Sequence, residues 1–416
     1  MGWVGWVLFG VFLGFFWVFL VFFGFFGVFG VFWGFEGFWI FLGFYFFLGH
    51  LTFGIEDIYP FFPLFRCTVC MIVVIFGSAG CIAVFRKFDV NYLYIFEIDP
   101  SHRMREMQML RLAMVLLFFW LLSFIFQYTL VKFKLFGPNN PSIFSFFLFL
   151  FLLIFIFFPF NFCFRKTRIE FVKALAHIII APFGLVKFRH FFLADILTSL
   201  TKPLQDFPMC ACFFFTEAWI FNEEPKCSWI VITVCIIGIL PFWWRFGQCL
   251  NKYHETKAVF PHLINAGKYT SGITVAVIHL CNVIFDIEFK GHWIIAYVIS
   301  TLYCYVWDIT MDWGLMRTNP KNPFLREKIM YPRWMYYFAM ITNLILRLTW
   351  TLTIADPPFI RDYLYLKHTE ILLFALLELY RRSQWALFRI ENENINNYEK
   401  YRTVLEIPRV QDHNVD

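Results

Sequence analysis

The feature that most limits what this chain can fold into is a series of long, continuous apolar runs. A helix of about 20 apolar residues crosses the hydrocarbon core of a bilayer. Only helices and closed barrels satisfy their backbone hydrogen bonds there, and a barrel strand alternates apolar with polar residues. The runs here do not alternate. The sequence therefore predicts an all-α, polytopic helical membrane protein, and a composition that is 60% hydrophobic and 15% charged agrees with this.

We predict ten transmembrane helices. The first lies within residues 1–49, in an apolar, low-complexity stretch whose first 65 residues contain no lysine or arginine and so lack the basic start of a signal peptide. The basic segment 165–190 surrounds a short apolar core and is typical of an amphipathic helix lying on the membrane. The other nine spans are predicted at 68–86, 107–131, 143–163, 193–222, 228–250, 270–288, 291–313, 334–355 and 364–388.

Lysine and arginine counts in alternate loops predict the orientation. One set of loops carries nineteen and the other carries six, and the richer side is expected to be cytoplasmic. Ten spans then place both termini in the cytoplasm. The expected divisions are an N-terminal segment with the first span (1–65), scaffold helices (66–164), an interfacial amphipathic segment (165–192), transport helices (193–390) and a polar cytoplasmic tail (391–416).

Several predicted spans contain ionisable side chains, each of which costs about 2.5–3.5 kcal/mol at the centre of a bilayer. In the span 334–355, Asn343, Arg347 and Trp350 lie at i, i+4 and i+7 and so share one helix face. We expect such stripes to line the inside of the bundle. The same spacing groups Asp308 with Asp312, Arg245 with Gln248, and Glu378 with Arg381 and Arg382, while Lys268 begins a further span.

These stripes contain more cations than carboxylates. The planar fork of arginine donates two parallel hydrogen bonds and suits a tetrahedral oxyanion. Neighbouring carboxylates orient the guanidinium groups and keep the anion from being trapped, because conduction needs binding that is also weak enough to release. The spacing therefore predicts an anion path. The alternative is that the charges form interhelical ion pairs that only lock the bundle, with those near 381–389 and Lys252 snorkelling to the interface.

Motifs in the same regions resemble the EXS-domain family, the membrane part of eukaryotic phosphate exporters of the xenotropic and polytropic retrovirus receptor and plant phosphate exporter type. They follow the family order over roughly residues 85–410. The matching stretches begin at Asp89 (DVNYLYIFEID), Leu193 (LADILTSL), Trp244 (WRFGQCL), Phe260 (FPHLINAGKY), Trp307 (WDITMDWG), Phe324 (FLRE), Leu346 (LRLTW), Glu378 (ELYRR) and Phe388 (FRIENE).

The resemblance implies a ten-helix EXS-type bundle that encloses a phosphate path, with a gate at Trp350. It assigns phosphate contact to Arg245, Lys268, Asp312, Arg347, Trp350, Glu378, Arg381 and Arg382. We expect four further residues to support them, namely Asp195, Asp308, Gln248 and Asn343.

Family members usually begin with a soluble, lysine-rich SPX domain that binds inositol pyrophosphates. Nothing before residue 66 is basic, so we expect an exporter without an SPX domain, and regulation by inositol pyrophosphates is in doubt. The expected partners are inorganic phosphate and the lipid bilayer, with a homodimer left open. The plasma membrane and the Golgi membrane both fit as locations, and sulfate remains open beside phosphate as the substrate.

Other function classes fit the sequence less well. A Golgi protein that recycles phosphate, or retains glycosylation enzymes without transporting anything itself, stays as the alternative. The net charge of +6 comes from short clusters between spans and does not indicate nucleic acid. Cys67 and Cys70 have no second cysteine pair at zinc-site spacing. The histidines are too dispersed for a helical metal motif, so we expect neither an enzyme nor a metal or cofactor site.

Overall fold

The structure, a computed structural model, describes residues 61–135, 142–181, 183–184, 186–217, 227–285, 290–317, 322–349, 351 and 364–401. The first predicted span and Trp350 lie outside these ranges. Within them, every assigned element is a helix, which confirms the all-α fold. The elements are α3 (Phe62–Lys87), α4 (Tyr92–Ile95), η2 (Pro100–His102), α5 (Glu106–Phe133), α6 (Ile143–Phe157), α7 (Arg165–Ile180), α8 (Phe188–Ser199), α9 (Thr201–Phe215), α11 (Ile230–Thr256), α12 (Val259–Phe285), α13 (Lys290–Trp307), η3 (Asp308–Asp312), α14 (Arg333–Arg347) and α17 (Leu364–Tyr401).

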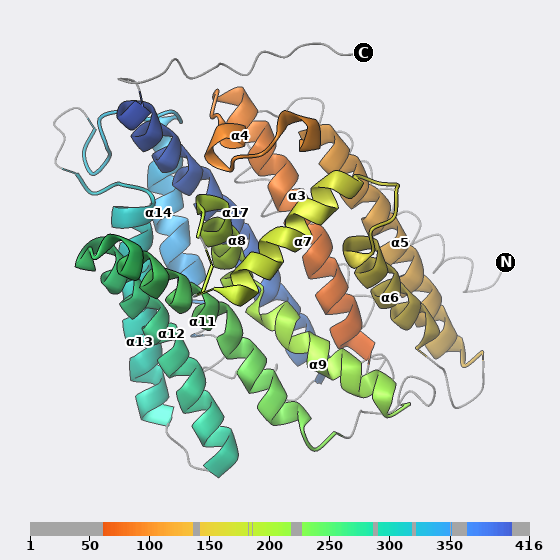
Figure 1. The fold of residues 1–416 in the computed structure, drawn as a ribbon. Coiled ribbons are helices and arrows are strands. Elements are labelled where there is room, and N and C mark those ends of the chain that lie inside the picture. Colours follow the sequence, from red (N-terminus) through yellow and green to blue (C-terminus); the bar gives the residue numbers. More distant parts are fainter. Residues whose placement is uncertain are drawn as a thin grey trace.

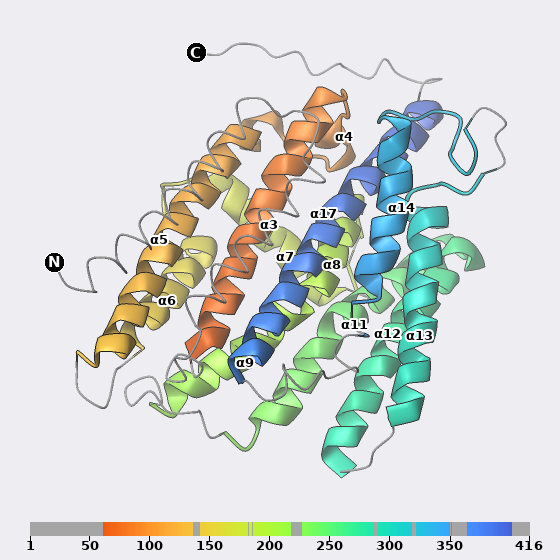
Figure 2. The same ribbon diagram turned by 180° about the vertical axis from the view of Figure 1, so that it is seen from behind.

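The long helices form a bundle with two sides and one helix between them (Figures 1 and 2). We call α3, α5, α6 and α9 the scaffold side, because α3 packs against each of the other three. On the other side α11, α12, α13 and α14 lie in sequence order. Helix α17 packs against α3 on one face and α14 on the other. Helix α7 runs obliquely across the outside of the bundle (Figure 1).

Five helical segments of the described chain are long and apolar enough to cross a membrane: Phe62–Lys87, Pro100–Phe133, Ile230–Thr256, Val259–Phe285 and Gly291–Asp312. Helix α6 is apolar but has only 15 residues. Large hydrophobic side chains are exposed along α5, α6, α11, α12 and α13, as expected of surfaces that face lipid rather than water. The molecule is therefore a multi-pass membrane protein, and the count of ten spans stays a prediction.

The predicted span 193–222 is wrong as a single helix. The structure divides it into α8 and α9, which meet at Leu200. Pro203 lies in the first turn of α9, where its missing N–H costs nothing, but within one continuous helix it would remove a backbone hydrogen bond. The break leaves Ser199 at the end of α8, inside the bundle. The basic segment 165–190 is divided too, because α7 ends at Ile180 and α8 begins at Phe188.

Two other helices extend past their predicted ends. Helix α12 begins at Val259, although Phe260 has non-helical dihedral angles, so Lys268 lies in the interior of the helix rather than at its start. Helix α17 continues to Tyr401, and Glu391 and Asn392 are buried within it. The start of the predicted polar tail is therefore packed against the protein.

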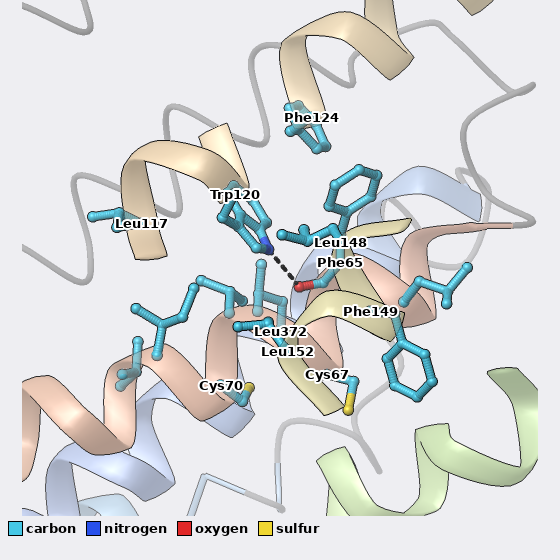
Figure 3. Close-up of a cluster of buried hydrophobic side chains, with 14 of the residues drawn as sticks. Phe65, Cys67, Cys70, Leu117, Trp120, Phe124, Leu148, Phe149, Leu152 and Leu372 are labelled. Carbon is cyan, nitrogen blue, oxygen red and sulfur yellow. Dashed lines mark hydrogen bonds between the residues drawn. The ribbon is translucent and has the colours of Figure 1, made fainter. Parts of the chain in front are cut away.

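The scaffold side has a continuous apolar core (Figure 3). The Trp120 indole stacks on Phe124, with 5.4 Å between ring centroids, and its Nε1 donates to the backbone oxygen of Phe65 at 3.0 Å. Helix α3 contributes more residues to this core than any other helix and is apolar around most of its circumference, as expected of a helix enclosed by others.

One ion pair is buried in this apolar surrounding. Arg66 of α3 donates through Nε and Nη2 to the two carboxylate oxygens of Asp206 on α9, at 2.8 and 2.6 Å. The side chains of Arg66 and Asp206 are 2% and 0% exposed. A third charge, Lys202, lies 3.9 Å from the same carboxylate and is a third exposed. The sequence analysis missed this pair.

A disulfide joins Cys212 at the end of α9 to Cys227, just before α11. It connects the scaffold side to the other side of the bundle. The sequence analysis did not predict this bond. Cys67 and Cys70, the one cysteine pair that it considered, are free and buried.

Candidate functional site

The predicted site residues come together from six elements around the middle of the bundle: α8, α11, α12, η3, α14 and α17. We call these elements the polar side of the bundle. Asp195 lies on α8, Arg245 and Gln248 on α11, and Lys268 on α12. The remaining described residues are Asp308 and Asp312 at the two ends of the π-helix η3, Asn343 and Arg347 on α14, and Glu378, Arg381 and Arg382 on α17.

Arg245 is held firmly on all sides. Its Nε donates to Asp195 at 2.8 Å and to the Tyr269 hydroxyl at 3.0 Å, and its Nη1 donates to Gln248 Oε1 at 2.7 Å. The guanidinium lies between two aromatic rings, 4.9 Å from the centroid of Phe191 and 4.8 Å from that of Tyr269. Arg245 therefore ties α11 to α8 and α12 through its Nε and Nη1 atoms.

Asp308 is the point where three elements meet. Its Oδ2 accepts hydrogen bonds from Arg347 at 2.5 Å, from Asn343 at 3.2 Å and from Arg381 at 3.4 Å. Arg381 also donates to Asn343 Oδ1 at 3.2 Å. The Nε of Arg347 is buried and has no hydrogen-bond partner among the described residues. Asp308 therefore orients two guanidinium groups without using all their donors.

A second carboxylate orients Arg381 from its own helix. Arg381 binds Glu378 through Nε and Nη2, at 2.7 and 2.6 Å. Ser199 donates to Glu378 at 2.5 Å and accepts from Arg382 Nε at 2.6 Å, while Arg382 Nη2 donates to Thr198 at 3.0 Å. Arg382 thus bonds to hydroxyls, and no carboxylate of the described chain forms a direct ion pair with it.

Lys268 is the least restrained cation of the site. Its side chain is buried, with Nζ 4.5 Å from the ring centroid of Tyr269 and 5.4 Å from that of Trp307. Within the described ranges it makes no ion pair and no hydrogen bond. Three carboxylates interact with its charge from further away, those of Asp195, Asp308 and Asp312.

Asp312 lies toward the end of the bundle that also holds the start of α14. It accepts from Trp385 Nε1 at 3.1 Å and lies 3.8 Å from Arg389 Nε. The Trp385 ring also lies under Arg382, 4.7 Å from its guanidinium carbon. Trp385 therefore separates the Arg381 and Arg382 pair from Arg389, a cation that our site prediction did not include.

A cavity of about 160 Å³ borders Arg382 on the side facing α3. Its lining is mainly apolar, with hydroxyl groups from Ser78 and Ser383, and Arg382 supplies the charge. Arg382 therefore touches both the polar network and an open volume inside the bundle.

The charges of the ionisable residues predicted for the site do not balance. Five cations face four carboxylates, so one positive charge is left over when all are ionised. The cations are Arg245, Lys268, Arg347, Arg381 and Arg382, and the carboxylates are Asp195, Asp308, Asp312 and Glu378. A buried surplus of positive charge is costly unless an anion compensates for it.

Uncharged partners are what the sequence analysis missed. Ser199 and Tyr269 both make hydrogen bonds that are central to the network. The position of each residue in the sequence could have indicated it: Ser199 lies one helical turn after Asp195, and Tyr269 directly follows Lys268. Trp350, predicted as a gate, lies outside the described residues, so its role stays a prediction.

Comparison with known proteins agrees with the motif order. The model of the EXS family matches residues 61–395. Similar proteins include "SPX and EXS domain-containing protein 1" of Dictyostelium discoideum, 36% identical over 82% of this chain and 37% of its own length. "Xenotropic and polytropic retrovirus receptor 1 homolog" of Danio rerio is 33% identical over 84% of this chain and 52% of its own. Human "Solute carrier family 53 member 1" is 32% identical over 85% of this chain and 53% of its own length. The chain thus spans between about a third and a half of the length of these relatives.

Proposed function

This chain belongs to the EXS family, and we propose on that basis that it is a membrane transporter or channel that exports inorganic phosphate. The observation that carries the proposal is the surplus of cations over carboxylates among the predicted site residues, with Lys268 left without an ion pair in the described chain. The human relative's name, which calls it a solute carrier, supports transport as the activity.

In this proposal phosphate exchanges its hydration shell for donors that the network leaves free. Lys268 supplies an ammonium without an ion pair in the described chain, Arg382 can exchange hydroxyl partners for a phosphate oxygen, and Arg347 has a buried Nε to offer. Asp308 and Glu378 hold the guanidinium groups apart and weaken the site enough for release. Arg245, which Asp195, Gln248 and Tyr269 hold through Nε and Nη1, serves as the fixed wall of the path.

Phosphate export through this path needs no coupled ion. A cell interior is electrically negative, and moving one charge across about 100 mV is worth about 2.3 kcal/mol. A divalent phosphate therefore gains electrical energy on leaving, and a gated path with a surplus of positive charge is sufficient. We propose Trp350 as the gate beside Arg347.

The orientation proposed from loop charges has support from the disulfide. Disulfides persist in oxidising compartments outside the cytosol. Cys212 and Cys227 flank the connection between α9 and α11, which the loop-charge count assigns to the side opposite the cytoplasm. Both termini then face the cytoplasm, in either the plasma membrane or the Golgi membrane.

The test is efflux of labelled phosphate from proteoliposomes, compared between the wild type and Arg347→Ala. We expect roughly 10- to 100-fold lower efflux in the variant, because charge-assisted hydrogen bonds contribute about 1.5–3 kcal/mol. Arg347→Lys retains the charge but lacks the planar guanidinium, so its efflux should lie between that of the wild type and that of Arg347→Ala. Sulfate added as competitor separates the two oxyanions. Efflux that is equal in wild type and Arg347→Ala, with both folded, would contradict the site.

A further inference from the structure

A further buried ion pair lies at one end of the polar side and takes no part in the path. Arg326, in the segment between η3 and α14, lies 2.5 Å from Glu391 of α17 through Nη2 and Oε2. The two side chains are 6% and 0% exposed. They belong to the FLRE and FRIENE motifs, which the phosphate path does not use.

Glu391 also holds the start of α14. Its other oxygen, Oε1, accepts from the backbone N–H of Met330 at 2.7 Å and from the Tyr336 hydroxyl. Tyr336 in turn accepts from the backbone N–H of Tyr331 at 3.2 Å. One carboxylate therefore connects α17 to both the segment before α14 and the first turn of α14.

Asn392, the next residue on α17, connects the same group to η3. Its Oδ1 accepts from Arg326 Nη1 at 2.9 Å, and its Nδ2 donates to the backbone oxygen of Asp312 at 3.0 Å. Arg326 Nη1 also donates to the backbone oxygen of Trp313 at 2.7 Å. Gly314 makes the approach feasible: its φ is +63°, and a Cβ there would lie 2.6 Å from Asn392 Oδ1.

We propose that Arg326, Glu391 and Asn392, which we call the latch, position the phosphate path. The three elements they join are those that carry Asp312, Arg347 and Arg382. Glu391 lies nine residues beyond Arg382, or roughly 13 Å along α17, so the latch fixes the register of the path helices from outside the path. The proposal rests on the proposed function, because positioning has meaning only for a path that conducts.

The competing interpretation is that the pair only stabilises the fold. The two interpretations differ for a variant in which both charges are replaced by apolar residues of similar volume, since such replacements of buried pairs are often neutral or stabilising. Under the competing interpretation, Arg326→Met/Glu391→Met is less stable, because the Met330 N–H and the Tyr336 hydroxyl lose their acceptor, but its folded molecules conduct normally. A positioning role requires that it folds but conducts poorly, because the contacts to α14 and η3 are lost with the charges.

The chain provides a matched control. Arg66 and Asp206 form a buried ion pair of the same kind on the scaffold side, outside the hydrogen-bond network of the path. The experiment compares phosphate efflux, its half-saturating concentration and hydrogen exchange in three proteins: the wild type, Arg326→Met/Glu391→Met and Arg66→Met/Asp206→Met. The latch variant should show roughly tenfold lower maximal efflux, with faster exchange at 322–331 and at the end of α17. The scaffold variant should retain wild-type efflux.

The outcomes separate the two proposals. Normal efflux in the folded latch variant overturns the latch and leaves the proposed function intact. If the wild type passes no phosphate, the proposed function fails and the latch proposal falls with it. If Arg326→Met/Glu391→Met does not fold, Glu391→Asp takes its place in the experiment. This variant retains the carboxylate charge on a shorter side chain. Glu391→Asp with unchanged efflux and exchange also overturns the latch.

Discussion

The scaffold side and the polar side both bury charge, but they manage it differently. On the scaffold side Arg66 and Asp206 form two parallel hydrogen bonds to each other in an apolar core. On the polar side the carboxylates are shared: Asp308 accepts from three side chains, and Arg382 binds hydroxyls instead of a carboxylate. The comparison teaches that a charge inside a membrane bundle does not by itself mark a site. A surplus charge held inside the bundle is the feature that indicates one, since Lys202, the extra cation of the scaffold side, is a third exposed.

The largest effect should come from breaking the scaffold pair on one side only. Asp206→Asn leaves Arg66 buried beside a neutral group, so we expect the free energy of unfolding to fall by about 3–5 kcal/mol, with most of it recovered in Arg66→Met/Asp206→Met. Thermal unfolding in detergent measures both variants. A loss of phosphate efflux per folded molecule in the double variant would show that the scaffold side also belongs to the path.

The disulfide joins the two sides, and its loss should affect stability alone. The bond between Cys212 and Cys227 closes a loop of 15 residues, for which chain entropy predicts a contribution of about 3 kcal/mol. We expect Cys212→Ser/Cys227→Ser to unfold at a lower temperature while its efflux per folded molecule stays at the wild-type level. Reduced efflux would mean that the relative position of α9 and α11 matters for the path.

On the polar side, removing a carboxylate charge should strengthen binding and slow release. Glu378→Gln raises the positive surplus from one to two while retaining a hydrogen-bond acceptor for Arg381. We expect the half-saturating phosphate concentration and the maximal efflux both to fall, by roughly threefold to tenfold, which corresponds to about 0.7–1.4 kcal/mol. Concentration dependence of efflux in proteoliposomes measures this. A rise in both quantities would mean that Glu378 supports phosphate binding rather than limiting it.

Helical spacing and hydropathy predicted much of the polar side. Asn343 and Arg347 lie on one face of α14 as the i, i+4 rule requires, and both reach Asp308. Charge is costly in a bilayer, so these residues stand out in an apolar sequence. Arg245 with Gln248, and Glu378 with Arg381, also form the contacts that their spacing indicates.

Spacing along one helix could not predict the other contacts, because those contacts depend on which helices pack against each other. Ser199 carries no charge, and its importance arises from the break at Leu200 and from the approach of α17. The pair of Arg66 and Asp206 is separated by 140 residues, and Arg66 lies just outside the predicted span 68–86. The disulfide was missed for a similar reason, since cysteine pairing does not follow from positions in the sequence.

The most direct test of the central claim compares two lysines, one from each side. Lys268 is buried without an ion pair in the described chain, whereas Lys202 lies beside the scaffold pair. If the surplus charge exists to bind an anion, Lys268→Met should lower phosphate efflux by roughly tenfold, or about 1.4 kcal/mol, without loss of thermal stability. Lys202→Met should leave efflux unchanged. Wild-type efflux in folded Lys268→Met would contradict the account, as would an equal loss in both variants.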